Sequence, residues 1–376
     1  MAGLYIHIPF CRQKCHYCNF YTVVSKKYRD SFIPVLLKEL EQRKDYLGGQ
    51  TINTIYFGGG TPSLLETDEI VQITVRINEL FSVSKEAEIT LEANPDDLNE
   101  EKIKALKNET PVNRLSIGVQ SFHDDDLAYL NRVHNSSQAR EAIEKSLKYG
   151  FENITIDLIY GIPTLTNQKW KDNLDTFFDF GLPHLSSYAL TVEHKTVLDT
   201  LITKHKTAPV DEEQTVGHFD ILLNETENHG FIHYEISNFA CEGYYSKHNS
   251  IYWLGGHYLG IGPSAHSFNG VSRQWNVANM KQYMEFEQTG TTVLEKEILT
   301  KDQQYNEYVM TSLRTSWGCD TEHIENVFGV SYTNLFLRHV NPFVEEGKVQ
   351  RKGNIYTLTN AGKLYADGIA AALFMT

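Results

Sequence analysis

Short apolar stretches alternate with amphipathic segments over residues 4–191, and this alternation limits the fold more than any other feature. Between the apolar stretches, hydrophobic residues recur at helical spacing, as they do from Phe32 to Leu40. The stretches themselves have the length of β-strands and lie at 4–8, 52–57, 88–93, 114–120, 154–160 and 185–191. Six consecutive strand–helix units predict an α/β fold with a parallel sheet. Right-handed crossovers would curl that sheet into a partial (β/α)6, TIM-like barrel.

The ends of these predicted strands carry the unusual residues of the chain. Glycine-rich or polar loops follow several of them, including 58–62, 94–96 and 161–163. The carboxyl ends of parallel strands meet at one rim of a barrel, and barrel enzymes hold their reactive groups there. We therefore expect these loops to face one another.

Three of the five cysteines, Cys11, Cys15 and Cys18, follow the first strand with the spacing C-x3-C-x2-C. Three thiolates on one loop can bind a soft metal ion or an iron–sulfur cluster. A closed structural zinc site requires a fourth ligand, and His16 lies too close to its neighbours to supply it. A redox dithiol does not account for three cysteines. A [4Fe–4S] cluster on three thiolates, with one iron corner open, fits the spacing best.

The cysteine loop and its lead-in, Tyr5-x-His7-Ile8-Pro9-Phe10, together resemble the radical S-adenosylmethionine (SAM) family. Within it they resemble the branch that contains oxygen-independent coproporphyrinogen III oxidase and the HemW haem chaperones. The resemblance implies a radical SAM barrel. It also implies that the open iron binds the amino and carboxylate groups of SAM, and that an added electron cleaves SAM to a 5′-deoxyadenosyl radical.

The resemblance also assigns SAM contacts residue by residue. Taken alone, the glycine run 58–60 is also compatible with a plain tight turn, and Glu92 and Asp157 with structural salt bridges. By motif match, Gly59, Gly60 and Thr61 form the loop that binds the amino group, and Arg132 pairs with the carboxylate. The full set of expected SAM contacts is Tyr5, Tyr17, Gly59, Gly60, Thr61, Glu92, Gln120, Arg132, Asp157 and Ala189.

A second motif, His248-Asn249-x-x-Tyr252-Trp253, resembles the HemW side of the family rather than the oxidase. A histidine beside aromatic rings can ligate haem iron while the rings flank the macrocycle. The alternative is a histidine that is hydrogen-bonded inside an aromatic loop. We interpret His248 as a candidate axial ligand, and His7, His257 and His266 as structural residues. The stretch 260–265 fits G-x-G-x-x-A, but no βαβ unit surrounds it, so a nicotinamide site is not expected.

Two features of the chain depart from the oxidase pattern. The oxidase carries a further cysteine two residues after the third, where this chain has Phe20. The oxidase also has an extended N-terminal segment over its substrate, whereas the first strand here begins at residue 4. Both differences favour a haem carrier that binds haem, a [4Fe–4S] cluster and exchangeable SAM. The alternative is the oxidase activity itself, the anaerobic oxidative decarboxylation of coproporphyrinogen III to protoporphyrinogen IX, so whether the chain is an enzyme stays open.

We expect three regions along the chain. Residues 1–200 form the radical SAM barrel, 201–290 a barrel extension with the haem-associated segment, and 291–376 a small winged-helix-like α+β domain. A helix is predicted over 211–230, with Asp211 as its cap, and a strand over 231–237. In the last region we expect helices at 302–314 and 320–346, a hairpin of 348–351 with 355–358, and a helix after Thr359.

Charge and cysteine usage limit the partners. A net charge of −14 argues against nucleic acid as the main partner. The odd cysteine count, with Cys241 and Cys319 as isolated free thiols, argues against a disulfide framework and favours a reducing compartment. With no apolar run long enough to span a bilayer, we expect a cytoplasmic protein. The resemblance implies a haem-acceptor protein such as one of the respiratory chain, and a flavodoxin- or ferredoxin-type electron donor. It is compatible with peripheral membrane association and with a homodimer.

Overall fold

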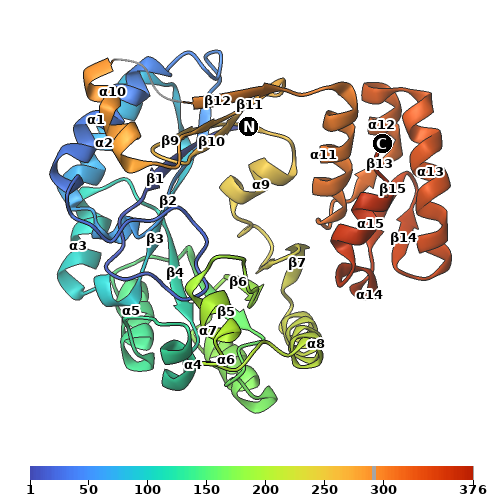
Figure 1. The fold of residues 1–376 in the computed structure, drawn as a ribbon, viewed down its shortest axis with the longest axis horizontal. Coiled ribbons are helices and arrows are strands. Elements are labelled where there is room, and N and C mark those ends of the chain that lie inside the picture. The colour runs from blue at the N-terminus through green and yellow to red at the C-terminus, as the bar shows by residue number, and fades with distance from the viewer. Residues whose placement is uncertain (290–293, 376) are drawn as a thin grey trace.

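A computed structural model describes residues 1–289 and 294–375 of the chain. Two bodies are apparent in Figure 1: a curved sheet wrapped by helices, coloured from blue to the light orange of α10, and a smaller C-terminal domain in dark orange and red. Each body has its own hydrophobic core. The larger core extends from Ala2 to Tyr283 and the smaller one from Tyr305 to Leu373.

The large sheet has the strand order β12-β11-β10-β9-β1-β2-β3-β4-β5-β6-β8-β7. Its central strands β1 to β6 are parallel to one another, as the alternation predicts. These strands are β1 (Ala2–Ile8), β2 (Ile52–Gly59), β3 (Val83–Ala93), β4 (Arg114–Gln120), β5 (Ile154–Tyr160) and β6 (His184–Ala189). The predicted partial barrel is confirmed, although β6 ends at Ala189, two residues before the predicted end. The Leu190 N–H still donates to the Tyr160 carbonyl at 2.8 Å.

Helices connect these strands along the outside of the curved sheet (Figure 1). They are α1 (Arg29–Gln42), α2 (Thr67–Leu80), α3 (Glu100–Glu109), α4 (Asp124–Tyr129), α5 (Ser136–Lys148) and α6 (Asn167–Asp179), with the 3-10 turns η1 (Pro62–Leu64) and η2 (Pro95–Asp97). None of the helices in the described part of the chain is both long and apolar enough to cross a membrane.

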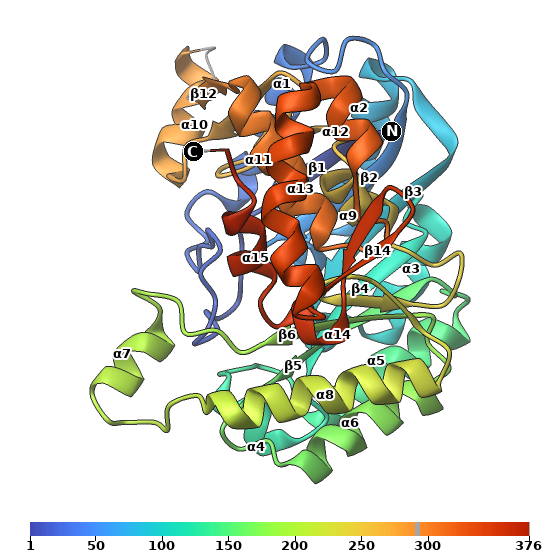
Figure 2. The same ribbon diagram turned by 90° about the vertical axis from the view of Figure 1, so that its right-hand side faces the viewer.

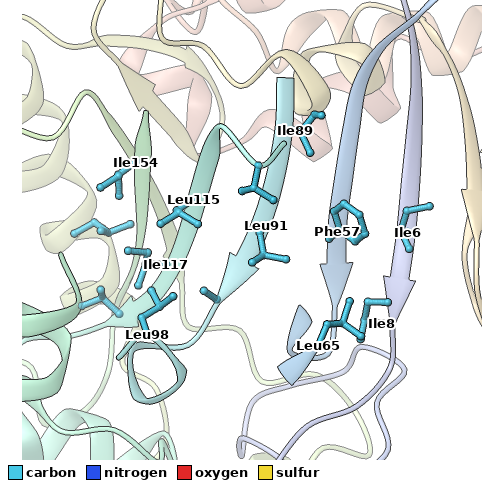
Figure 3. Close-up of a cluster of buried hydrophobic side chains, with 14 of the residues drawn as sticks. Ile6, Ile8, Phe57, Leu65, Ile89, Leu91, Leu98, Leu115, Ile117 and Ile154 are labelled. Atoms are coloured by element: carbon cyan, nitrogen blue, oxygen red, sulfur yellow. The ribbon is translucent and has the colours of Figure 1, made fainter. Parts of the chain in front are cut away.

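Side chains along the parallel strands alternate between two environments. One set is apolar and packs with the helices in a single core; Figure 3 draws part of it, including Ile6, Ile8, Phe57, Leu91, Leu115, Ile117 and Ile154. The other set is largely polar and includes His7, Tyr56, Glu92, Ser116, Asp157 and Ser186. Because successive side chains of a strand point to opposite faces, the polar set lines the inside of the curved sheet.

Residues beyond β6 extend the sheet at both of its ends. On the β6 side, α7 (Val197–Thr203) and α8 (Glu212–Asn228) lead to β7 (Ile232–Glu235) and β8 (Asn238–Ala240), which pair antiparallel. The β-carboxylate of Asp211 caps α8 as predicted. On the β1 side the added elements are α9 (Lys247–Trp253), β9 (His257–Ile261), β10 (His266–Phe268), β11 (Ser272–Asn276), α10 (Met280–Thr289) and β12 (Leu294–Ile298). The sheet thus runs past the boundary at residue 291 that the sequence indicates.

The C-terminal domain is a winged-helix-like unit with three corrections to the predicted elements. It contains α11 (Lys301–Leu313), α12 (Thr321–Phe328), α13 (Val330–Glu345), α14 (Asn360–Lys363), α15 (Ala366–Ala372), β13 (Cys319–Asp320), β14 (Val349–Lys352) and β15 (Ile355–Leu358). The expected helix over 320–346 is two helices, because Gly329 takes a φ of 96° between them. The hairpin has a third strand, β13, which pairs with β15. The last helix is likewise two short helices, α14 and α15 (Figure 2).

A buried ion pair joins α1 to the β9–β11 extension. The Glu39 carboxylate is fully buried and lies 3.5 Å from Arg43 Nη1. It also accepts hydrogen bonds from the Gly262 N–H (2.9 Å) and the Tyr283 hydroxyl (2.7 Å). Arg43 in turn donates to the Gly260 carbonyl at 3.0 Å. The extension is therefore held to the barrel by charges that water does not reach.

Replacing Glu39 by Ala should destabilise the fold by about 3–5 kcal/mol, because Arg43 would remain buried without its counter-charge. Urea unfolding followed by circular dichroism would measure this loss. Glu141→Ala, which removes the exposed partner of Lys145, should leave the unfolding midpoint nearly unchanged. Equal midpoints for the two variants would contradict a structural role for the buried pair.

Candidate functional site

The cysteine loop begins directly after β1 and is docked on the turn that follows α4. The backbone N–H of His16 donates to the Leu130 carbonyl at 3.1 Å, and its ring Nδ1 lies 3.0 Å from the Tyr129 carbonyl. The Asn131 side chain donates to the Lys14 carbonyl at 2.9 Å. His16 and Asn131 thus fix the cysteine loop on this turn.

The three thiols are free and half-buried. Burial, with smaller contributions from the neighbouring Cys18 and Cys15 thiols, raises the pKa of Cys11 to about 11. Among the described residues, no three His, Cys, Asp or Glu side chains converge on one metal ion. A zinc ion needs thiolate ligands at about 2.3 Å, whereas a cubane spreads its ligands over separate iron corners. The three thiols line one pocket and can supply the three protein ligands of a [4Fe–4S] cluster.

The glycine turn after β2 packs against the lead-in to the cysteine loop. Gly59 has a φ of 108°, and a Cβ there would lie 2.5 Å from the His7 ring. A Cβ on Gly60 would lie 2.7 Å from the Phe10 carbonyl oxygen. Both positions require glycine, because any side chain would displace the strand that carries the cysteines.

A chain of hydrogen bonds links two of the thiols through residues that follow β2, β3 and α4. The Thr61 hydroxyl donates to Cys11 Sγ at 3.4 Å, and Arg132 Nη1 donates to Cys15 Sγ at 3.3 Å. Asn94 bridges them: its Nδ2 donates to the Thr61 hydroxyl (3.3 Å) and its Oδ1 accepts from Arg132 Nη2 (2.6 Å). The sequence analysis did not assign a role to Asn94, although its position at the end of the third strand was a usable signal.

Arg132 retains one unsatisfied donor in this network. Its Nη2 also donates to the Gly118 carbonyl at 2.8 Å, but its Nε is buried and has no hydrogen-bond partner in the described part of the chain. A buried guanidinium N–H without a partner is costly unless a ligand accepts from it. The side chain therefore suits the recognition of a carboxylate.

Two carboxylates lie on the inner face of β3 and β5. Glu92 accepts hydrogen bonds from the Tyr56 hydroxyl (2.8 Å) and the Gly59 N–H (3.1 Å), and burial raises its pKa. Burial also raises the pKa of Asp157 to about 7, and the negative charge of Glu92 adds to the effect. Asp157 is thus protonated in a large fraction of molecules near neutral pH, when it can donate a hydrogen bond to a ligand.

These groups surround a pocket of about 380 Å³ at the carboxyl ends of the strands. A volume of this order is typical of a small-molecule site. The three cysteines line it, as do Tyr17, Gly59, Gly60, Thr61, Glu92, Gln120, Arg132, Asp157 and Ala189. Gln120 reaches it from a left-handed backbone conformation, with a φ of 68°. Lining residues without an assigned role in the sequence include Asn94, Ser116, Gly118, Ile159, Tyr188 and Leu190.

Tyr5 does not line this pocket. Its hydroxyl lies 3.0 Å from His7 Nδ1, and its ring stacks on Tyr56 and on His248, with centroids 6.2 and 6.3 Å apart. It belongs to a layer of rings that separates the pocket from α9.

The structure does not position His248 as an axial haem ligand. The residue is 1% exposed, its Nδ1 lies 2.7 Å from the Thr54 hydroxyl, and its Nε2 lies 2.9 Å from the Tyr252 hydroxyl. Burial lowers its pKa to about 3. Since both ring nitrogens are engaged, the alternative of a histidine hydrogen-bonded among aromatic residues describes it better. Asn249 and Trp253 lie on the same short helix and are half-buried.

Parts of this chain match known domain families, and known proteins are similar to nearly all of it. Residues 5–177 match the radical SAM superfamily, and residues 299–365 match the HemN C-terminal domain. The chain is 35% identical over 376 residues to the heme chaperone HemW of Bacillus subtilis, covering 99% of each chain. It is 34% identical over 343 residues to HemW of Lactococcus lactis, covering 91% of this chain and 89% of that one. The chain belongs to the HemW family.

This chain shares its fold with an enzyme of known structure. Coproporphyrinogen III oxidase (HemN) from Escherichia coli superimposes on this chain with a TM-score of 0.85 at 23% identity. The match covers 100% of this chain and 90% of the oxidase. At this identity the likeness concerns the fold, so the barrel and the C-terminal domain are a framework common to the two proteins.

The raised pKa of Asp157 predicts a pH-dependent stability difference. A carboxyl whose pKa is higher in the folded state favours folding below about pH 4 and loses that contribution as the pH rises through about 7. Asp157→Asn should therefore gain stability relative to the unsubstituted protein between pH 5 and 8 in urea titrations. Asp179→Asn, at an exposed position, should show a constant difference. A pH-independent difference for Asp157→Asn would contradict the raised pKa.

Proposed function

We propose that this HemW-family protein is a haem chaperone that carries a [4Fe–4S] cluster and SAM, binds haem and transfers it to an acceptor protein. The observation that carries the proposal is the convergence of three thiols, an arginine with a free donor and two carboxylates on one pocket. Relatives named as heme chaperones, similar over nearly their full length, support the haem function.

The residues of the rim suit the two cofactors. Cys11, Cys15 and Cys18 would hold the cluster, which together with SAM supplies reductive cleavage of a sulfonium when both are bound. Arg132 would hold the SAM carboxylate, and Gly59, Gly60 and Thr61 its amino group. The remaining predicted contacts, Tyr17, Glu92, Gln120, Asp157 and Ala189, would surround the sugar and base.

Delivery of haem requires further partners. We propose an acceptor such as a respiratory-chain haemoprotein, and a flavodoxin- or ferredoxin-type donor that reduces the cluster. A cytoplasmic location with transient contact at a membrane surface would bring carrier and acceptor together, and a homodimer is compatible with this function. The acidic charge continues to disfavour nucleic acid as a partner.

A turnover assay decides between the carrier and the oxidase. Reconstituted anaerobic protein is supplied with SAM, a reductant and coproporphyrinogen III, and in parallel with haem. We expect stable haem binding, seen as a shifted Soret band, and no protoporphyrinogen. Appearance of protoporphyrinogen would establish the oxidase instead. Phe20, which is 66% exposed at the pocket where the oxidase has a cysteine, motivates the expected absence of turnover.

The cluster assignment predicts a selective loss of iron. Replacing Cys11, Cys15 and Cys18 together by Ala should abolish the binding of iron and sulfide after anaerobic reconstitution, because the cluster loses all of its protein ligands. Iron and sulfide analysis and the absorption spectrum would measure this loss. Cys241→Ala, a free cysteine outside the pocket, should bind as much of both as the parent. Iron uptake by the triple variant, or tetrahedral zinc in the parent, would refute the assignment.

A further inference from the structure

A second groove opens between the barrel and the C-terminal domain. It has a volume of about 620 Å³, and its walls come from β6, α8 and the α14–α15 region. These elements face one another across the two bodies in Figures 1 and 2. Its floor includes the rings of Tyr160 and Phe219, which stack with centroids 6.1 Å apart. We refer to it as the interdomain groove.

The walls of the interdomain groove carry apolar side chains that water reaches. Tyr188, Val216 and Leu364 are each 42% exposed, and Tyr365 is 56% exposed. They come from β6, from α8 and from the turn between α14 and α15, so they meet only in the folded protein. A group of large exposed apolar residues at a groove is typical of a binding site. Tyrosine rings on opposite walls suit a flat aromatic ligand.

Two cations lie among these apolar residues. Lys363 Nζ contacts His233 Nδ1 (2.8 Å) and Asn360 Oδ1 (3.1 Å), and in the described part of the chain no carboxylate lies within ion-pair distance of it. Burial lowers the pKa of His233 to about 3, so this neighbour is neutral. Arg314 pairs with the exposed Asp367, but its Nε is buried and has no hydrogen-bond partner among the described residues. The groove therefore offers donors for anionic groups next to an apolar surface.

The interdomain groove adjoins the SAM pocket. Tyr188, Ala189 and Thr191 line both cavities. A ligand in the groove would thus lie next to the cluster and SAM, separated from them by the end of β6. His248, by contrast, lies behind the ring layer formed by Tyr5 and Tyr56.

We propose that the interdomain groove is the haem-binding site, with the macrocycle between the Tyr188 and Tyr365 walls and the propionates on Lys363 and Arg314. The inference rests on the proposed haem-chaperone function and adds the location of the haem-binding site. Haem is a flat, apolar molecule with two carboxylates. Its ring matches the shape and the apolar walls of the groove, and its carboxylates match the two donors. Because the groove opens to solvent, bound haem would be accessible to an acceptor.

Haem titrations of groove variants test this site. Lys363→Gln keeps a hydrogen-bonding side chain but removes the charge, and should raise the Kd for haem about tenfold. Val216→Asp places a negative charge on an exposed wall and should weaken binding at least as much. Matched controls are Lys352→Gln on β14, and Val330→Asp at a 58% exposed position on α13. Both should bind haem like the parent, and circular dichroism verifies the fold of every variant.

Metal-free protoporphyrin IX separates the groove from iron ligation by His248. If the groove recognises the porphyrin ring and the propionates, metal-free protoporphyrin IX should bind to the parent protein. Its affinity should fall in Lys363→Gln by the same factor as the affinity for haem. Unchanged haem and porphyrin affinities in both groove variants would overturn the site while leaving the chaperone function intact. A change of oligomeric state in Val216→Asp without weaker haem binding would assign the groove to a second copy of the chain and also overturn it. If the parent protein binds neither ligand, the proposed function itself fails.

Discussion

The parallel register of β1 to β6 is the constraint on which the rest of the structure depends. It sets Tyr5 beside Tyr56, Glu92 beside Ser116 and Asp157 beside Ser186. Because side chains alternate between faces, a slip of one residue in any strand would turn its polar side chains into the helix-packed core. The same strand pairing therefore buries the apolar side chains against the helices on one face of the sheet and brings the polar side chains together on the inner face.

The cysteine loop depends on this framework for its shape. Its lead-in packs against glycines of the turn after β2, its middle is docked on the turn after α4, and two of its thiols accept hydrogen bonds from Thr61 and Arg132. Residues that fix the conformation of the cysteine loop, such as Thr61 and Arg132, also line the pocket. A ligand with amino and carboxylate groups would find its partners already oriented, which reduces the entropy lost on binding.

A haem carrier has to bind a large apolar cofactor and still release it. The aromatic layer around His248 is closed and fully hydrogen-bonded, which suits stability rather than exchange. The interdomain groove is open and apolar, and its Lys363 ammonium has no ion-pair partner among the residues that the structure describes. The C-terminal domain contributes one wall of that groove, so a framework shared with an oxidase can serve a carrier through side chains at the junction of the two bodies.

The sequence alone determined the six parallel strands, the cysteine loop and most of the pocket, because strand periodicity and strand-end residues are local features. It placed Thr61, Glu92 and Arg132 correctly at one rim for the same reason. Only the tertiary structure decided the bridging role of Asn94, the engagement of His248 and the existence of the interdomain groove. Each of these depends on contacts between segments far apart in the chain. A local sequence pattern does not indicate which distant side chain hydrogen-bonds to a polar group or buries it.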